Sequence, residues 1–221
     1  MSKAFGFSHD DARRFYNRFG ARQDAQGFYE NAALDALIRL GRFGDARSVL
    51  EVGCGTGKFA TRLLSDHLPP TARYTGIDIS ETMVRLAGHR LGPWSDRATA
   101  ITSDGGFDFA SFGMTFDRVI FTYVLDLLSE DDLGRALGGA HAVAEKGGVL
   151  CAAGLTHGPA GLSRATSAIW AAVHRVRPSL VGGCRPLVLS DRLDPTQWRL
   201  SHKEIVVRAT IASEVVVAEA V

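Results

Sequence analysis

Residues 48–58 read SVLEVGCGTGK, and this stretch determines the expected fold. The apolar residues at 48–52 predict a short buried strand. Glycines 53, 55 and 57 predict a tight turn, and the pattern at 58–65 predicts a helix directly after it. A strand that ends in bare backbone at the start of a helix presents N–H groups to a ligand. We therefore expect a ligand site at this turn.

The same alternation of strand and helix continues downstream. Strands are predicted at 73–79, 98–102, 116–122 and 149–155, helices at 81–91 and 130–144, and a turn at 145–148. Ser80 is placed to cap the helix at 81–91. This order predicts a doubly wound, mostly parallel sheet with helices on both faces and with ligands at the carboxyl ends of the strands.

The two ends of the chain show other patterns. A helical pattern covers 8–40, with a break near Gly20, and 198–210 and 211–218 predict two antiparallel strands that close the sheet. Segment 156–197 is long for a connection between strands. We expect a single domain, which divides into the following parts: an N-terminal helical lid at 1–47, a cofactor-binding core at 48–155, a substrate roof at 156–197 and closing strands at 198–221.

Composition argues against several classes of partner. The chain has 25 Lys+Arg and 24 Asp+Glu, a net charge of +1, so we expect no nucleic acid and no anionic membrane as a partner. Its three cysteines are far apart and form no metal-binding or redox pair, which favours a reducing cytoplasm and no metal. The best apolar run, 149–155, is far shorter than the roughly 20 residues of a transmembrane helix. The oligomeric state stays open, with a homodimer as one option.

Three glycine-rich motifs compete for the turn. A P-loop requires a glycine five positions before Gly57 and a Ser or Thr after Lys58, and the chain has Val52 and Phe59 there. The dinucleotide motif G-x-G-x-x-G/A fails when it starts at Gly53, because Lys58 occupies its third position. Started at Gly55, it places Ala60 there. A nicotinamide-dependent oxidoreductase therefore remains an alternative.

The string VLEVGCGTG at 49–57 resembles the first motif of class I S-adenosylmethionine-dependent methyltransferases. The resemblance extends over 48–155 and to the closing strand pair, and it looks most like the small-molecule branch that includes the ubiquinone and menaquinone C-methyltransferases. It implies a Rossmann-like, seven-stranded sheet of order 3-2-1-4-5-7-6 with an antiparallel last strand. It also implies S-adenosyl-L-methionine as the cofactor and a small, partly apolar methyl acceptor.

The resemblance also assigns roles within the cofactor site. Gly53, Gly55 and Gly57 would line the methionyl and ribose portion, and Glu51 would order the turn or receive the amino group through water. Asp78, at the end of the second strand, would accept the ribose hydroxyls, a role that nicotinamide enzymes share. The other residues expected around the cofactor are Ile79, Met83, Asp104, Gly105, Thr122 and the lid residue Tyr16.

Catalytic and acceptor-binding residues are less sharply indicated. Methyl transfer needs alignment and a dry pocket, and a proton acceptor where the acceptor atom carries a proton. Tyr123, Asp126 and His157 follow strands at the ligand-bearing edge and are the candidates for this assistance. In the roof segment, Trp170, His174 and Arg185 are the candidates for acceptor binding. A non-catalytic module that binds the cofactor is a further alternative, and the methylated atom (O, N, S or C) stays open.

Overall fold

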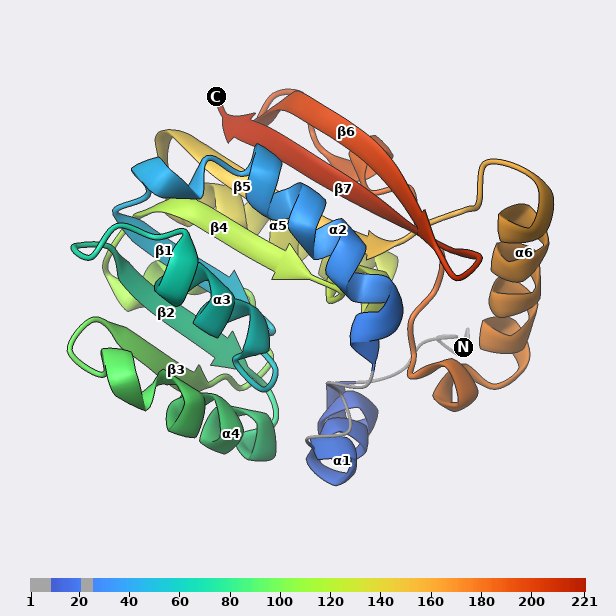
Figure 1. Ribbon diagram of the computed structural model, residues 1–221, viewed down its shortest axis with the longest axis horizontal. Coiled ribbons are helices and arrows are strands. Elements are labelled where there is room, and N and C mark those ends of the chain that lie inside the picture. Colours follow the sequence, from blue (N-terminus) through green and yellow to red (C-terminus); the bar gives the residue numbers. More distant parts are fainter. Residues whose placement is uncertain (1–8, 21–25) are drawn as a thin grey trace.

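The computed structural model describes residues 9–20 and 26–221, and its centre is one sheet of seven strands in the order β3-β2-β1-β4-β5-β7-β6 (Figure 1). The strands are β1 (Ser48–Val52), β2 (Arg73–Asp78), β3 (Ala98–Thr102), β4 (Phe116–Thr122), β5 (Ala144–Leu155), β6 (Trp198–Arg208) and β7 (Ile211–Ala220). The first five strands pair in parallel, and β7 is antiparallel to both β5 and β6. The predicted sheet order and closing hairpin are confirmed.

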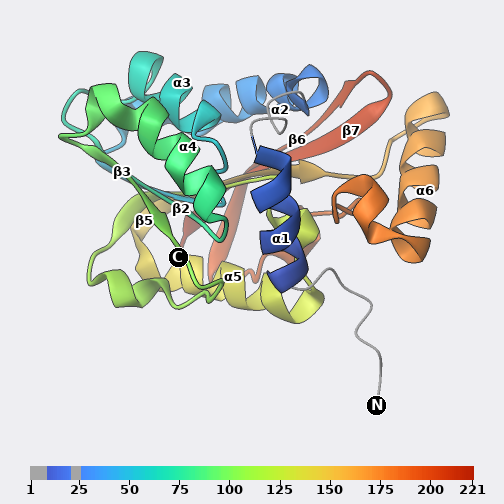
Figure 2. The same cartoon turned by 90° about the horizontal axis from the view of Figure 1, so that it is seen from below.

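Six α-helices are present in the described part of the chain: α1 (His9–Phe19), α2 (Gly27–Leu40), α3 (Lys58–Asp66), α4 (Glu81–Leu91), α5 (Glu130–Val143) and α6 (Gly161–Val176). Figure 2 shows α2, α3 and α4 on one face of the sheet and α5 on the other. One core cluster packs side chains such as Leu37 and Leu63 against the sheet, and a second does so with Leu133 and Leu137. β4 is buried along nearly its whole length, as its apolar sequence predicts.

The predicted turn at 145–148 is wrong. β5 begins at Ala144, immediately after α5, and not at residue 149. Ala144 pairs with Phe116, and the register then shifts before Arg118 pairs with Val149. Gly147 has φ +73°, so the chain bulges there and resumes pairing. The glycines thus serve a bulge within the strand.

α1 and α6 lie at the carboxyl edge of the parallel strands, whereas α2 packs on one face of the sheet against β5, β6 and β7. α1 ends next to Gly20, and α4 is capped by Ser80, whose Oγ accepts from Met83 N at 3.2 Å, as predicted. Segment 156–197 forms α6 and three-residue to four-residue 3₁₀ turns. Among the helices in the described residues, none is long and apolar enough to cross a bilayer.

Candidate functional site

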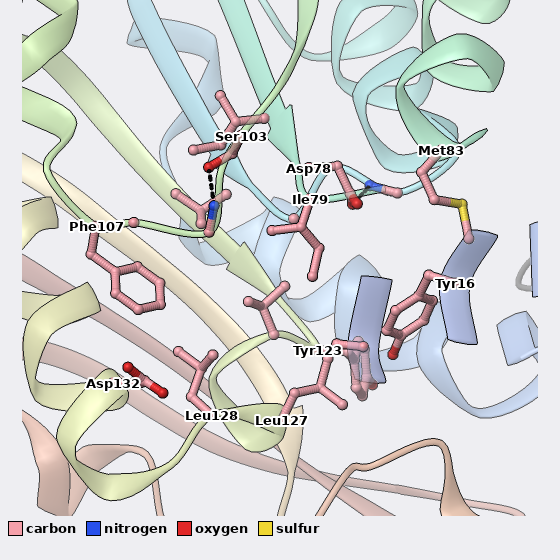
Figure 3. A pocket seen from close by; sticks show the side chains of 18 of the residues that line it. Tyr16, Asp78, Ile79, Met83, Ser103, Phe107, Tyr123, Leu127, Leu128 and Asp132 are labelled. Carbon is pink, nitrogen blue, oxygen red and sulfur yellow. Dashed lines mark hydrogen bonds between the residues drawn. The ribbon is translucent and has the colours of Figure 1, made fainter. Parts of the chain in front are cut away.

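A cleft with about 940 Å³ of open space lies at the carboxyl edge, where the glycine turn, the ends of β2, β3 and β4, and α1 meet (Figure 3). Figure 3 shows Tyr16 and Met83 at one end and Phe107 and Leu128 at the other. Of the predicted cofactor residues, those that line it are Tyr16, Gly53, Gly55, Asp78, Ile79, Met83, Gly105 and Thr122.

The structure explains in different ways why each of the three turn positions is a glycine. All have positive φ: +72° at Gly53, +53° at Gly55 and +76° at Gly57. A Cβ at Gly53 would lie 2.2 Å from Val124 Cγ2, and one at Gly57 would lie 3.0 Å from the Ala87 backbone. A Cβ at Gly55 would meet nothing within 4 Å. Gly53 and Gly57 are therefore required by packing, whereas Gly55 leaves space open beside the cleft.

Asp78 ties the end of β2 to the glycine turn. Its Oδ2 accepts from Gly55 N and its Oδ1 from Ser80 N, both at 2.9 Å. Burial raises the pKa of its carboxyl group, and the two backbone N–H donors oppose that rise. The carboxylate thus fixes both loops and faces the cleft from between them.

Glu51 lies on the other side of the turn, in a smaller hollow that also includes Lys58 and Arg62. Its Oε2 accepts from Tyr74 Oη at 2.5 Å, and its Oε1 from Thr122 Oγ1 at 3.3 Å. Burial raises its pKa to about 7, against the effect of these two donors. Gly53, Gly55 and Thr122 border both spaces, so the turn separates them.

The raised pKa of Glu51 predicts a pH-dependent stability. The folded protein keeps this proton between the unfolded value of 4.5 and about 7, where the unfolded chain releases it. Stability should therefore fall as pH rises through that window, by on the order of 3 kcal/mol. Glu51→Gln should remove the part of this fall that Glu51 causes. The free energy of unfolding, measured with urea at about pH 5 and at about pH 8, tests this. Glu81→Gln, an exposed control, should keep this fall; equal slopes in the wild type and Glu51→Gln would contradict the prediction.

α1 is held against the cleft by two polar side chains that sequence reasoning missed. Arg13 donates from Nε to Ile79 O at 3.3 Å and from Nη2 to Asp104 O at 3.0 Å. Asn17 Oδ1 accepts from Ser80 Oγ at 2.6 Å. Two carbonyls at the ends of β2 and β3 thus hold the helix that carries Tyr16. The sequence offers no signal for these bonds, because they join positions more than 60 residues apart.

Removing the Arg13 contacts should loosen α1 over the cleft. We expect Arg13→Gln to speed ligand dissociation by about tenfold, since two charge-assisted hydrogen bonds are lost. Stopped-flow displacement of bound cofactor measures this rate. Arg14→Gln is the matched control, because Arg14 lies on the same helix and pairs with Asp11 at 3.3 Å. Equal dissociation rates for the two variants would show that the Arg13 bonds do not hold the lid.

The loop after β3 contributes differently from the prediction. Gly105 and Ser103 line the cleft, and Gly105 N donates to Ser103 Oγ at 3.1 Å. Asp104 is exposed, and its Oδ1 accepts from Gly106 N at 2.7 Å. Its side chain is not among the groups that line the cleft.

Tyr123 is the candidate catalytic residue that borders the cleft. It follows β4 with φ +56°, a left-handed conformation that is uncommon for an aromatic residue. Its hydroxyl lies 2.8 Å from Ser213 Oγ, and its ring meets the Tyr29 ring edge-on at 5.8 Å. These contacts from β7 and α2 keep the strained residue in place.

Asp126 and His157 lie outside the main cleft. Asp126 is fully buried, and its Oδ2 accepts from Leu155 N at 3.0 Å, which joins the loop after β4 to the end of β5. Burial raises the pKa of Asp126 to about 6, and within the described residues its Oδ1 has no hydrogen-bond partner. His157 is exposed and lies in a separate hollow with Arg185.

The three predicted roof residues are not brought to the main cleft either. Trp170 Nε1 donates to Cys184 O at 3.0 Å, and His174 Nε2 lies 3.1 Å from Gly183 O. Arg185 donates to Glu130 Oε1 at 2.9 Å and to Leu128 O at 2.8 Å. In the structure they brace the 183–185 loop against α6 and against the start of α5.

An apolar wall of the cleft was also missed. Phe107 and Phe109 come from the loop after β3, and Val124, Leu127 and Leu128 from the loop after β4. The signal was available, because apolar side chains that directly follow strands of a parallel sheet lie at its ligand-bearing edge. They make much of this part of the cleft apolar.

Comparison with known proteins agrees with this geometry. Residues 49–148 match the family model described as a methyltransferase domain, whereas a search of curated proteins finds no match. The structure is similar to the N-methyltransferase NodS from Bradyrhizobium japonicum WM9, solved in complex with S-adenosyl-L-homocysteine, with a TM-score of 0.72 and 18% identity over 95% of this chain and 98% of that one. It is also similar to an O-methyltransferase family protein from Burkholderia thailandensis, with a TM-score of 0.65 and 15% identity over 97% and 63% of the two chains.

The [4+2]-cyclase SpnF has the same kind of fold, with a TM-score of 0.63 and 18% identity over 86% of this chain and 81% of that one. At such identities the likeness establishes the fold alone. The chain therefore has the Rossmann-like sheet that these solved proteins share, and its residues 49–148 match the model of a methyltransferase domain.

Proposed function

We propose that this protein is an S-adenosylmethionine-dependent methyltransferase that acts on a small, partly apolar acceptor. The observation that carries the proposal is the open space beside Gly55, bordered by the carboxylate of Asp78. A bare backbone beside an acid at the end of the next strand suits a ribose bound flush against the turn. NodS, which has this fold, is solved with S-adenosyl-L-homocysteine.

The cofactor residues take the following proposed places. Asp78 accepts the ribose hydroxyls, while Ile79, Met83 and Gly105 border the adenine. Gly53 and Thr122 lie toward the amino-acid portion, next to the hollow that contains Glu51. Ionised Glu51 would then favour the cofactor's ammonium group. Tyr16 covers the cofactor from α1, so within the predicted lid at 1–47 we propose α1 as the part that closes over the cofactor. Residues 1–8 and 21–25 of that range lie outside the part of the chain that the structure describes.

When bound, S-adenosylmethionine supplies an electrophilic methyl group for in-line displacement by an acceptor atom. The protein's part is to align the acceptor and exclude water, and the apolar wall of Leu127, Leu128 and Phe107 suits both tasks. Tyr123 is the proposed catalytic residue that can touch the acceptor. We propose Asp126 as a positioning residue for Tyr123, because it fixes the intervening loop to β5.

The acceptor is proposed to be a small molecule because the cleft is lined largely by apolar side chains. Segment 156–197 includes Trp170, His174 and Arg185, and Arg185 donates to the backbone oxygen of Leu128, a residue that lines this cleft. In our proposal they act on the acceptor through the 183–185 loop that they brace. His157, in the neighbouring hollow, is proposed only for an acceptor that extends beyond the main cleft.

The test combines binding and turnover. Calorimetry should show micromolar binding of S-adenosylmethionine and S-adenosylhomocysteine and none of NAD. Incubation with methyl-labelled cofactor and a panel of thiols, phenols, amines and quinol-like carbons should then transfer label to one class. Binding of NAD in place of S-adenosylmethionine would overturn the cofactor assignment. Tight cofactor binding with no labelled product in a broad panel would favour a non-catalytic module.

A further inference from the structure

An exposed apolar stripe runs along the outer face of α6. Leu162, Ile169 and Val176 are 75%, 65% and 80% exposed, and their spacing of seven places them on one side of the helix. Ala165 and Ala172 occupy the turns between them and are also exposed. The following 3₁₀ turn (Pro178–Val181) adds Leu180, which is 69% exposed. Scattered apolar side chains are ordinary on a surface, but a continuous stripe indicates a binding face.

The opposite face of α6 attaches it to the domain. Ser163 and Ser167 are buried, Thr166 Oγ1 donates to Thr210 Oγ1 at 3.0 Å, and Trp170 bonds the 183–185 loop. Figures 1 and 2 both show α6 at the margin of the molecule, beside the tip of the β6–β7 hairpin. The stripe is therefore turned away from the domain, and no described element covers it.

The charges around the stripe have one sign. The sequence contains no Asp or Glu from residue 146 to residue 190. Arg164, Arg175 and Arg177 are exposed in this segment, and the spacing of eleven puts Arg164 and Arg175 on the same flank of α6. The net charge of +1 averages over this local asymmetry. The overall charge predicts no anionic partner for the chain as a whole, but it does not exclude one for this single face.

We propose that α6 and the 178–181 turn bind the surface of an anionic lipid bilayer. The helix lies in the plane of the headgroups, with Leu162, Ile169 and Val176 inserted and the arginines extended to lipid phosphates. A helix of 16 residues that is polar on its inner face lies on a bilayer and does not cross it. The absence of acidic residues from 146–190 fits an anionic lipid surface better than an uncharged lipid surface.

A second copy of α6 is a poor occupant for the stripe. If two copies pack antiparallel about the helix centre, Arg164 of one lies opposite Arg175 of the other. Like charges oppose each other in this arrangement, which disfavours antiparallel pairing. The bilayer proposal does not depend on the methyltransferase assignment, because the stripe is separate from the cleft.

The test is co-sedimentation of the full-length protein with vesicles, without cofactor. Vesicles of phosphatidylcholine with about one third phosphatidylglycerol should bind the protein, binding should weaken with salt, and phosphatidylcholine alone should bind far less. Ile169→Ser with Val176→Ser should reduce binding by about tenfold or more. Arg175→Gln with Arg177→Gln should remove the preference for anionic lipid. These positions are exposed, so circular dichroism should show folded variants.

Two matched controls keep the proposal open to failure. Ile101→Ser changes a 42% exposed side chain on β3, at the opposite edge of the sheet, and Arg85→Gln removes an exposed arginine from α4. Both should bind vesicles like the wild type. Absence of binding to anionic vesicles would overturn the proposal, as would equal losses in Ile101→Ser and in the α6 variants. A dimer in light scattering that Ile169→Ser with Val176→Ser dissociates would assign the stripe to a second copy.

Discussion

Gly55→Leu is expected to weaken binding of S-adenosylmethionine by about a hundredfold or more while the protein stays folded. A Cβ at this position meets no protein atom within 4 Å, so the first atom of the added side chain has room beside the turn. It fills space at the cleft that the bound nucleoside needs. Calorimetry with S-adenosylmethionine and with S-adenosylhomocysteine measures the loss.

Backbone strain must be separated from blocked space in this variant. Gly55 has φ +53°, a conformation that costs a residue with a side chain roughly 1–2 kcal/mol. Gly113 has φ +64°, also has no atom within 4 Å of a Cβ, and does not line the cleft. Gly113→Leu should therefore lose similar thermal stability yet bind normally. If folded Gly55→Leu binds as tightly as Gly113→Leu, the nucleoside does not lie against this turn.

Asp78→Ala is the second large expected effect, a loss of about a hundredfold or more in cofactor affinity. Two hydrogen bonds from ribose hydroxyls to a charged acceptor contribute about 1.5–3 kcal/mol each, part of which Asp78→Asn should retain. Asp104→Ala is the control, because that carboxyl group is exposed and bonds its own loop. It should change affinity much less.

Asp78 also accepts from Gly55 N and Ser80 N, so the variant alone does not separate ribose binding from loop order. The two effects are separated by a thermodynamic cycle, in which the wild type and Asp78→Ala each bind S-adenosylhomocysteine and an analogue that lacks the ribose hydroxyls. The wild type should strongly prefer the natural compound, and Asp78→Ala should show almost no preference. An unchanged preference in Asp78→Ala would mean that another group holds the ribose.

The elements of the core were predictable because their signals are local. The boundaries of β1, β3 and β4 agree with the predicted ranges, and Ser80 caps α4 as expected. Local patterns failed at 145–148, where two glycines are equally compatible with a turn and with a bulge. Only the pairing of Ala144 with Phe116 selects the bulge, and that pairing joins distant parts of the chain.

The parts of the site that could be predicted are those that depend on a single short segment of sequence. Gly55 and Asp78 could be placed because Gly55 follows β1 and Asp78 ends β2, and parallel strands bring their carboxyl ends to one edge. Roles that depend on side-chain direction could not be placed in this way. Asp126 follows β4 as Tyr123 does, yet it turns into the interior and bonds Leu155, while Tyr123 borders the cleft.

The sequence by itself determined the strands and the glycine turn, since periodicity, turn residues and capping are properties of neighbouring residues. The order of the strands was implied by the resemblance of residues 49–57 to a methyltransferase motif. The tertiary structure alone decided which glycine leaves space open, which carboxyl groups are buried, and that Arg13 joins α1 to the ends of β2 and β3. These features arise from contacts between residues far apart in the chain. Burial, hydrogen bonding and pKa depend on the neighbours that folding supplies, and a linear pattern does not specify them.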